Sequence, residues 1–519
     1  MADQLAVALR LLPSALAGHV LLSASALVLG LMLSLPLAVL AFRQPRLRWA
    51  VLVLASGVQT VPSLALLALF YPLLLALSAV IRPLTGYALP ALGFLPSLLA
   101  LTLYSMLPIL RTAVAGLAGI DPAVREAADG VGMTPAQRLW RVEVPLAAPV
   151  AMAGVRTAAV WTIGAATLST PVGQTSLGDY IFSGLQTETW SLVLFGCAAS
   201  ALLALAADQL LGVIEAGARR RDGRRIGLGL AGLVVGVIAC LAPASAAQLS
   251  RPARAYVVGA KNFSEQFTLA ALIGDRLRAG GAGVRVQQGL GSAVIFHALA
   301  AGDIDVYVDY SGTLWTNVLG RRDTPARAVM LAELGRELKA RYGVVLLGPL
   351  GFENAYVLAM TGPRARALGV QSLSDLAGRA PDLALGADLE FLRRPEWAAL
   401  QAAYGLSFKA ERSYSPTFMY RALQDGDADV ISAFSSDGRI AADDLMVLSD
   451  PRHALPPYDA VVLISPKRAG DARLLGALRP LIGKISVDAM RAANLTVDRD
   501  QDKATPAQAA KALEARVGP

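Results

Sequence analysis

An internal repeat in the second half of the chain ends in an aromatic residue in each of its two copies. Residues 296–306 and 420–430 share the pattern A-L-x-x-G-D-x-D-V at an offset of 124 residues. The pattern predicts the end of a helix, a Gly-Asp turn and a strand, and the strands end at Tyr310 and Phe434. Ligands of open α/β sheets bind at the carboxyl ends of strands, so we expect both rings to face one cleft. For either ring alone, packing in a hydrophobic core is the competing interpretation.

Five short motifs follow one another in order between Val257 and Leu463. They are 259–266 (GAKNFSEQ), 309–313 (DYSGT), 354–356 (NAY), 435–439 (SSDGR) and 456–458 (PPY). Together they resemble the osmoprotectant-binding proteins of ABC importers, a family that binds glycine betaine, carnitine and choline. The resemblance implies a two-lobed type II periplasmic binding-protein fold with an aromatic cage for a quaternary ammonium group. Matched motif by motif, the cage positions are Tyr310, Tyr356, Phe434 and Tyr458.

The chemistry of a quaternary ammonium group agrees with a cage of rings. A trimethylammonium group has no hydrogen to donate, so a protein must hold it by ring faces in a site without water. Each cation–π contact then contributes up to about 2 kcal/mol. Phe434 stands where the family usually has tyrosine, so it keeps the ring face and lacks the hydroxyl. We therefore expect the affinity or the choice of ligand to differ from those of the family.

A betaine also carries a carboxylate, and the resemblance suggests Lys261, Thr313 and Arg394 as its partners. An arginine can hold a carboxylate through two parallel hydrogen bonds. The match leaves Arg393 as an alternative to Arg394. No metal ion is expected, because the 2 cysteines lie in apolar stretches and no cluster of metal ligands accompanies them. No catalytic residue and no cofactor are expected either.

These residues must be positioned by an α/β fold. Short apolar segments alternate with helical patterns throughout residues 251–519, which indicates α/β lobes. We expect one lobe to comprise about 254–358 and 459–519, and the other about 359–458. The expected strands are 256–259, 284–287, 303–308, 383–386, 428–433 and 460–464.

Residues 1–225 have a different composition. They hold 15 Lys and Arg and 10 Asp and Glu, and no lysine precedes Lys261. A helix needs about 20 apolar residues to span a membrane. The segments that qualify are 16–41, 51–79, 91–116, 146–168, 191–215 and 226–247. We therefore expect an all-α permease with about six spans, formed by a transmembrane domain over 1–218 and by a cytoplasmic basic cluster with the sixth span or anchor over 219–250. A substrate-binding domain is expected over 251–519.

Basic residues between the apolar segments cluster at 43–48, 121–145 and 219–225, which are alternate loops. Such clusters remain in the cytoplasm by the positive-inside rule. The rule then places the binding domain on the periplasmic or extracellular side of the cytoplasmic (inner) membrane. Much of the net charge of +8 is thus explained by topology, and nucleic-acid binding is not expected.

The segment 226–247 has two interpretations. It follows an arginine-rich flank and ends in Ala244-Ser245-Ala246, as a secretory signal with its cleavage site does. Cleavage would release residues 248–519 as a separate protein. We favour an uncleaved anchor, because an internal signal would have to be processed after five spans.

The loop 121–145 predicts two short helices. Asp121 before Pro122 predicts the N-cap of the first helix, and 134–137 (TPAQ) predicts a capping box for the second. Glycines at 130 and 132 separate the two helices, and we expect the second to end before Pro145. A helical hairpin on the membrane surface is the simplest interpretation.

The same loop resembles the EAA signature of ABC importer permeases, whose fold is called MetI-like. In that family the loop docks on a separate ATPase subunit. No phosphate-binding pattern G-x-x-x-x-G-K-[ST] occurs in the sequence, so ATP hydrolysis is expected from another polypeptide. The matching residues are Glu126, Ala127, Ala128, Gly132 and Pro145.

These observations predict a fused permease and substrate-binding protein that imports quaternary-ammonium osmoprotectants such as glycine betaine. By resemblance, the permease forms a homodimer and works with a separate ATPase. Ergothioneine, which has the same trimethylammonium and carboxylate groups, and carnitine remain open as ligands. Choline fits less well if Arg394 points into the site, since choline has no carboxylate.

The competing class of protein is a membrane receptor that senses a ligand without transport. Such a receptor would need a cytoplasmic signalling domain, and the longest predicted cytoplasmic segment is 121–145.

Overall fold

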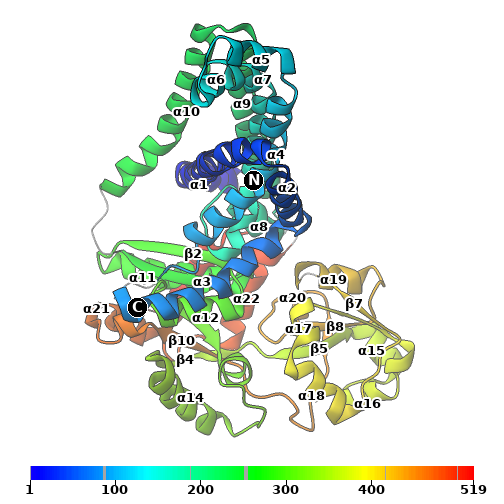
Figure 1. Ribbon diagram of the computed structural model, residues 1–519. Coiled ribbons are helices and arrows are strands. Elements are labelled where there is room, and N and C mark those ends of the chain that lie inside the picture. The colour runs from blue at the N-terminus through cyan, green and yellow to red at the C-terminus, as the bar shows by residue number, and fades with distance from the viewer. Residues whose placement is uncertain are drawn as a thin grey trace. The chain divides into compact units, whose positions relative to one another are not determined.

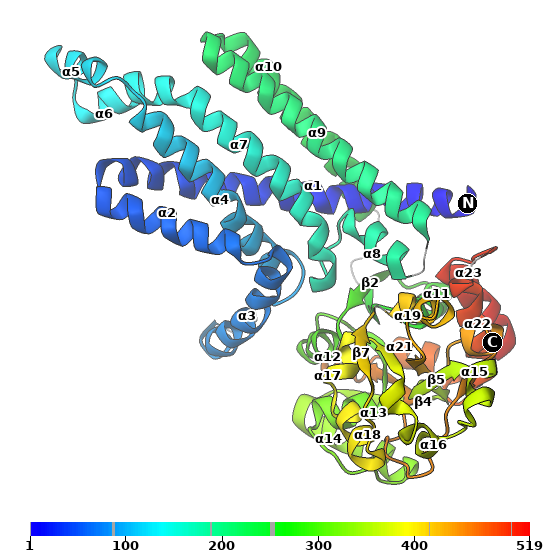
Figure 2. The ribbon, with the colours of Figure 1, turned by 90° about the vertical axis from the view of Figure 1, so that its right-hand side faces the viewer.

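The computed structural model describes residues 2–85, 89–186, 189–249, 255–414, 416–499 and 501–518 (Figure 1 and Figure 2). The chain divides into two compact units, one of residues 1–182 with 191–250 and one of residues 183–190 with 251–519. The first unit is helical, and the second contains both β-sheets. The division near residue 250 falls where the composition changes from apolar to normally charged.

Six helices in the described part of the chain are long and apolar enough to cross a membrane, as predicted. The second predicted span, 51–79, is divided at Pro62, because proline has no backbone N–H to continue the helix. Pro72 lies inside the later helix. The helices are α1 (Ala2–Arg43), α2 (Pro45–Thr60), α3 (Ser63–Thr85), α4 (Phe94–Ala118), α5 (Pro122–Gly130), α6 (Pro135–Arg138), α7 (Val144–Ala166), α8 (Gly178–Gln186), α9 (Trp190–Arg220) and α10 (Gly223–Leu249).

Helix α4 packs against both α1 and α7. Small residues at the crossings allow this close approach, as is usual between membrane helices. A Cβ atom at Gly154 of α7 would lie 1.9 Å from Thr112 Oγ1, and one at Gly30 of α1 would lie 2.0 Å from Ser105 Oγ. Larger side chains at either glycine would therefore force the helices apart.

A network of charged side chains joins α7 to α9. Arg156 donates two hydrogen bonds to Asp208, at 2.9 and 2.8 Å, and a third to Glu215 at 2.8 Å. Arg219 donates to the other oxygen of Glu215 at 2.6 Å. Charged side chains within apolar helices are expensive unless they are paired, so this network fixes the two spans to each other.

Helix α10 packs on α9 through glycines. A Cβ atom at Gly229 would lie 2.5 Å from Ile214 Cγ1, and one at Gly232 would lie 2.7 Å from Leu210 Cδ2. The helical backbone continues through residues 244–246 and ends at Leu249. The sixth apolar segment is thus packed as a span of the helical unit.

The second unit contains two five-stranded sheets with the same spatial arrangement of strands, in the orders β2-β1-β3-β10-β4 and β7-β6-β8-β5-β9. Each sheet has one antiparallel strand, β10 in the first and β5 in the second. Figure 1 shows the second sheet in a separate lobe, coloured yellow. The strands are β1 (Tyr256–Lys261), β2 (Val284–Leu290), β3 (Val306–Tyr310), β4 (Val345–Glu353), β5 (Tyr356–Thr361), β6 (Ala384–Ala387), β7 (Ala410–Ser413), β8 (Val430–Phe434), β9 (Leu445–Val447) and β10 (Asp459–Ile464).

Helices cover the sheets, as the alternating pattern predicts. Together with the matched sheet orders, this is the two-lobed α/β architecture expected of residues 251–519. The helices are α11 (Ser264–Ala279), α12 (Ser292–Ala301), α13 (Ser311–Thr313), α14 (Arg327–Tyr342), α15 (Gly362–Leu368), α16 (Leu373–Ala377), α17 (Leu389–Arg393), α18 (Pro395–Tyr404), α19 (Pro416–Gln424), α20 (Arg439–Ala442), α21 (Ala472–Leu478), α22 (Val487–Asp498) and α23 (Pro506–Val517).

The sequence repeat corresponds to a structural repeat. Gly302 after α12 and Gly426 after α19 have φ angles of +82° and +80°, a left-handed conformation that glycine adopts without strain. Asp305 accepts a hydrogen bond from the backbone of β1 at 2.8 Å, and Asp429 accepts one from Ala384, the first residue of β6, at 2.9 Å. The shared G-D-x-D pattern therefore ends a helix and fixes the central strand in each lobe.

The sequence analysis omitted four strands, β4, β5, β7 and β9. Because β5 belongs to the second sheet, the chain crosses between lobes at 354–355, slightly before the expected residue 358. It returns through residues 448–458, and Asn354 N donates to Tyr458 O at 3.0 Å where the two crossovers meet. These crossovers connect the lobes next to the predicted cage.

Candidate functional site

The strand register brings the four predicted cage residues to the junction of the lobes. Tyr310 ends β3 and Phe434 ends β8, so the two copies of the repeat contribute one ring each. Tyr356, the first residue of β5, pairs directly with Phe434 across the second sheet. Tyr458 immediately precedes β10.

The rings form one connected cluster. The Tyr356 centroid lies 5.0 Å from that of Phe434, with 43° between the planes, and 6.0 Å from that of Tyr458, with 89°. Perpendicular rings of this kind can serve as adjacent walls of a cage. Phe263 connects Tyr310 to Phe434, with centroids 6.2 and 6.1 Å away. The sequence analysis did not select Phe263, although it lies within the motif 259–266.

Arg394, the predicted carboxylate partner, lies over a ring of the cluster and is paired with a carboxylate of the protein. Its Cζ atom is 5.2 Å from the Tyr356 ring centroid. Its Nη2 donates to Thr313 Oγ1 at 3.3 Å, which joins two of the predicted ligand residues. The same arginine donates to Glu396 Oε2 through Nε at 3.1 Å and to Oε1 through Nη2 at 2.8 Å.

Glu396 is a buried carboxylate that the sequence analysis did not identify. Burial raises its pKa, but the hydrogen bond and the charge of Arg394 act in the opposite direction and leave the pKa below its ordinary value. Glu396 Oε1 also accepts hydrogen bonds from Tyr458 and Thr316. The glutamate therefore holds one predicted cage ring and one predicted carboxylate partner.

Lys261 has an internal partner as well. Its Nζ atom lies 2.5 Å from Asp309 Oδ1, and Tyr307 donates to the other oxygen of Asp309 at 2.5 Å. The same ammonium is 5.2 Å from the Tyr310 ring centroid. In this structure Lys261 is paired with Asp309 beside the ring of Tyr310, and its contact with a ligand carboxylate stays a prediction.

A third buried carboxylate, Glu265, lies behind the cage. It accepts hydrogen bonds from Tyr310 Oη at 2.6 Å, Asn354 Nδ2 at 3.0 Å and Asn494 Nδ2 at 2.9 Å. Burial raises the pKa of Glu265, while these donors lower it in part. Asn494 donates also to Ser436 O at 2.9 Å, so a single amide connects both lobes.

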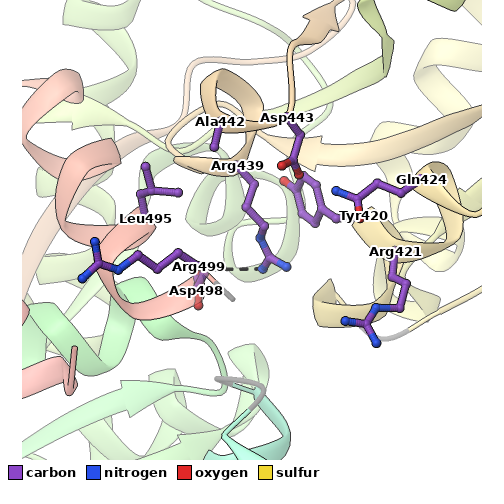
Figure 3. Close-up of a pocket in the computed structure, with 9 residues that line it drawn as sticks. All are labelled: Tyr420, Arg421, Gln424, Arg439, Ala442, Asp443, Leu495, Asp498 and Arg499. Atoms are coloured by element: carbon purple, nitrogen blue, oxygen red, sulfur yellow. Dashed lines mark ion pairs between the residues drawn. The ribbon is translucent and has the colours of Figure 1, made fainter. Parts of the chain in front are cut away.

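The loop 435–439, which follows Phe434, rests on α22 of the other lobe. Arg491 donates to Ser435 O at 2.9 and 2.7 Å, and a Cβ atom at Gly438 would lie 2.4 Å from Arg491 O. Arg439 lies 4.0 Å from Asp498, the ion pair drawn in Figure 3, beside a cavity of about 120 Å³. The lobes are thus joined by backbone and charged contacts next to the cage.

The loop predicted to bind an ATPase forms two short, capped helices in the helical unit. Asp121 caps α5 by accepting from Ala123 N at 2.9 Å, and Thr134 and Gln137 form the predicted capping box of α6. Gly132 between them has a φ angle of +79°. Glu126 and Ala127 are exposed and Ala128 is buried, so one edge of α5 faces outward.

The prediction that the second helix of the loop ends before Pro145 is wrong, because the helical backbone continues through Pro145. A π-helical segment, Leu139–Glu143, connects α6 to α7, and Pro145 lies in the first turn of α7. The wider turn accommodates the proline, whose ring would clash with a carbonyl of the preceding α-helical turn. The loop therefore continues as helix into α7. The same span carries Arg156, which binds Asp208 and Glu215 of α9.

The six-span helical unit and the two-lobed unit with its ring cluster define a membrane permease joined to a solute-binding protein. Comparison with known families agrees. Residues 26–220 match the family described as binding-protein-dependent transport system inner membrane component, and residues 254–514 match the substrate-binding domain of ABC-type glycine betaine transport systems. The chain belongs to this family of ABC importers, as a fused, multi-pass inner-membrane subunit.

Some similar proteins match only the permease half or only the binding half of this chain, and one matches both halves. The chain is 28% identical over 481 residues to the ergothioneine transport permease/ergothioneine binding protein EgtU of Helicobacter pylori (strain G27), which covers 89% of this chain and 83% of that protein. It is 38% identical over 197 residues to the choline transport system permease protein OpuBB of Bacillus subtilis (strain 168), covering 38% and 83%. A solved glycine betaine/carnitine/choline ABC transporter structure aligns with 28% identity and a TM-score of 0.44, covering 49% and 96%.

Proposed function

We propose that this subunit imports a quaternary-ammonium solute such as glycine betaine. The observation that carries the proposal is the cluster of Tyr310, Tyr356, Phe434 and Tyr458, which come from both lobes. Ring faces bind a trimethylammonium group by cation–π attraction where water is excluded. Arg394 and Thr313, which contact each other beside Tyr356, are suited to the carboxylate of a betaine.

In the proposed cycle, the lobes close on the solute as a hinged clamp and deliver it to the permease. The crossovers at 354–355 and near Tyr458 serve as the hinge. A separate ATPase docks on the loop that contains Glu126 and Gly132, and two copies of the permease form the translocation path. The chain itself carries out no covalent step.

The binding unit is proposed to work outside the cytoplasm and to remain attached. The basic clusters of the sequence support this orientation. The packing of α10 on α9 and its helical backbone through residues 244–246 support an anchor that is not cleaved, because a protease would have to unwind the helix.

Ergothioneine is the second candidate, and carnitine and choline are further alternatives. The observation that favours ergothioneine is the similarity to the Helicobacter pylori ergothioneine protein over both halves of the chain. Ergothioneine has the trimethylammonium and carboxylate groups of glycine betaine and an added imidazole-thione ring. The same four aromatic residues would therefore serve either ligand.

Calorimetric titration of the purified full chain with glycine betaine, ergothioneine, carnitine and choline tests the proposal. We expect saturable binding of at least one of them, and uptake of the same solute by vesicles that also contain the ATPase. Absence of binding to all four would refute the proposed function.

A further inference from the structure

Glu396 is placed to influence the choice of ligand. It lies in the first turn of α18 and only 1% of its surface is exposed. Its Oε1 atom accepts from Arg394, from Thr316 Oγ1 at 3.0 Å and from the hydroxyl of Tyr458, while Oε2 accepts from Arg394 Nε at 3.1 Å. One carboxylate is thus bonded to an arginine and a ring that both belong to the proposed site.

Arg394 and Lys261 of the proposed site already have carboxylate partners within the protein. Arg394 is paired with Glu396 at 2.8 Å, and Lys261 is paired with Asp309 at 2.5 Å. Both pairs are buried. A ligand carboxylate that approaches Arg394 therefore competes with a carboxylate that is already bonded to it.

We propose that Glu396 is a specificity-determining residue: by neutralising Arg394, it makes the native site discriminate weakly between a trimethylammonium zwitterion and a trimethylammonium cation without a carboxylate. This inference rests on the proposed quaternary-ammonium site. Choline, which the sequence analysis disfavoured because of Arg394, is then an acceptable ligand. The cation–π contribution of the rings is common to both ligands, so the difference between them depends on the charge beside Arg394.

The substitution Glu396→Gln removes the charge and keeps the shape. A glutamine can present its oxygen at the Oε1 position, where it still accepts from Thr316 and Tyr458. Arg394 then loses the carboxylate with which it is paired, which is unfavourable for a buried cation. The carboxylate of glycine betaine can supply the missing negative charge, whereas choline cannot. The affinity for glycine betaine relative to choline is therefore expected to rise at least tenfold.

A structural role alone predicts a different result. If Glu396 only held Tyr458 and Thr316 in place, its loss would lower the affinities for glycine betaine and choline by the same factor. The ratio of the two affinities would then stay unchanged. Thr316→Val is the matched variant for this role, because it removes one hydrogen bond to Glu396 without changing a charge. It is expected to leave the ratio within about twofold of the native value.

The experiment is a calorimetric titration of the full chain in nanodiscs with glycine betaine and with choline, each for the native protein, Glu396→Gln, Thr316→Val and the exposed control Glu411→Gln. For the native protein we expect two dissociation constants within about tenfold of each other. A native preference above a hundredfold for glycine betaine would overturn the inference, even if the Glu396→Gln variant failed to fold.

The failures of the two proposals can be told apart. Binding of either ligand with an unchanged ratio in Glu396→Gln would refute the role of Glu396 and leave the quaternary-ammonium site standing. Absence of binding of both ligands to the native protein would refute that site and, with it, the role of Glu396.

Discussion

Asn494 donates a hydrogen bond to Glu265 at 2.9 Å, and through it the two lobes share one buried carboxylate. Glu265 accepts from Tyr310 in the first lobe, while the second amide hydrogen of Asn494 reaches Ser436 O, two residues after Phe434. Rings from both lobes are thus positioned with reference to the same side chain. The proposed cage therefore depends also on residues that need not contact the ligand.

Asn494→Ala is expected to weaken ligand binding by about tenfold. The substitution removes one of the donors to Glu265 and the amide donor to Ser436 O, and a lost buried hydrogen bond of this kind costs about 1–3 kcal/mol. Calorimetric titration with the ligand identified for the native protein measures the effect. Gln371→Ala, at an exposed amide side chain on the surface of the second lobe, is the control. Native affinity in Asn494→Ala would show that the shared carboxylate does not position the cage.

Tyr356→Ala is expected to weaken binding at least tenfold, because the ring lies within 6.0 Å of two other cage rings and under the guanidinium of Arg394. Tyr356→Phe keeps the ring face and should retain most of the affinity. Tyr342→Ala, at a ring that packs on Phe296 in the first lobe, controls for a general loss of an aromatic side chain. Unchanged affinity in Tyr356→Ala would remove Tyr356 from the proposed site.

The stability of the binding unit is expected to decrease as the pH rises from about 4 to about 7. Burial raises the pKa of Asp498 from its ordinary value of 3.8 to about 7. Between these two values the folded state keeps a proton on Asp498 that the unfolded state has released. The stabilisation from this bound proton is fully present below about pH 4 and is lost as the pH rises to about 7. Urea unfolding of residues 251–519, which have their own hydrophobic core, measures the slope.

Two asparagine variants on α22 separate Asp498 from other groups. Asp498→Asn should flatten the pH dependence between pH 4 and 7, while Asp488→Asn, at an exposed carboxylate of the same helix, should keep the native slope. A native slope in Asp498→Asn would assign the titration to another group.

Gly132→Trp is expected to abolish uptake and to leave ligand binding intact. Gly132 has a φ angle of +79°, which a bulky residue adopts only with strain, so the turn between α5 and α6 would change. Vesicle uptake and calorimetry measure the two effects separately. Gly130→Ala is the matched control, since no atom lies near its added methyl group and its φ angle is not positive. Continued uptake by Gly132→Trp would refute the role of the loop in coupling.

The sequence alone was sufficient to predict the structural features that repeat along the chain or that have a fixed local residue pattern. The G-D-x-D repeat predicted the ends of β3 and β8, and the capping residues predicted α5 and α6. Apolar length alone predicted six spans. Each of these features depends on residues that are close together in the chain, so a local pattern can reveal them.

The parts that the sequence analysis missed depend on contacts between distant residues. Glu396 is one of many glutamates in the sequence, and only the fold brings it to Arg394 and Tyr458. Asn494 reaches Glu265 across 229 positions of the chain. The strands β7 and β9 are short, and partly exposed residues obscure their pattern. The pairing of Lys261 with Asp309 joins two strands, and the sequence analysis did not predict it.

Helix α10 has a kinetic consequence. It packs on α9 and continues to Leu249, and the first strand of the binding unit begins at Tyr256 of the same chain. With the proposed anchor intact, a captured solute molecule would reach its permease by an intramolecular step, whose rate does not depend on how much binding protein the cell makes. Uptake should scale with the number of transporters alone, and overproduction of free binding units should compete for solute without increasing the flux.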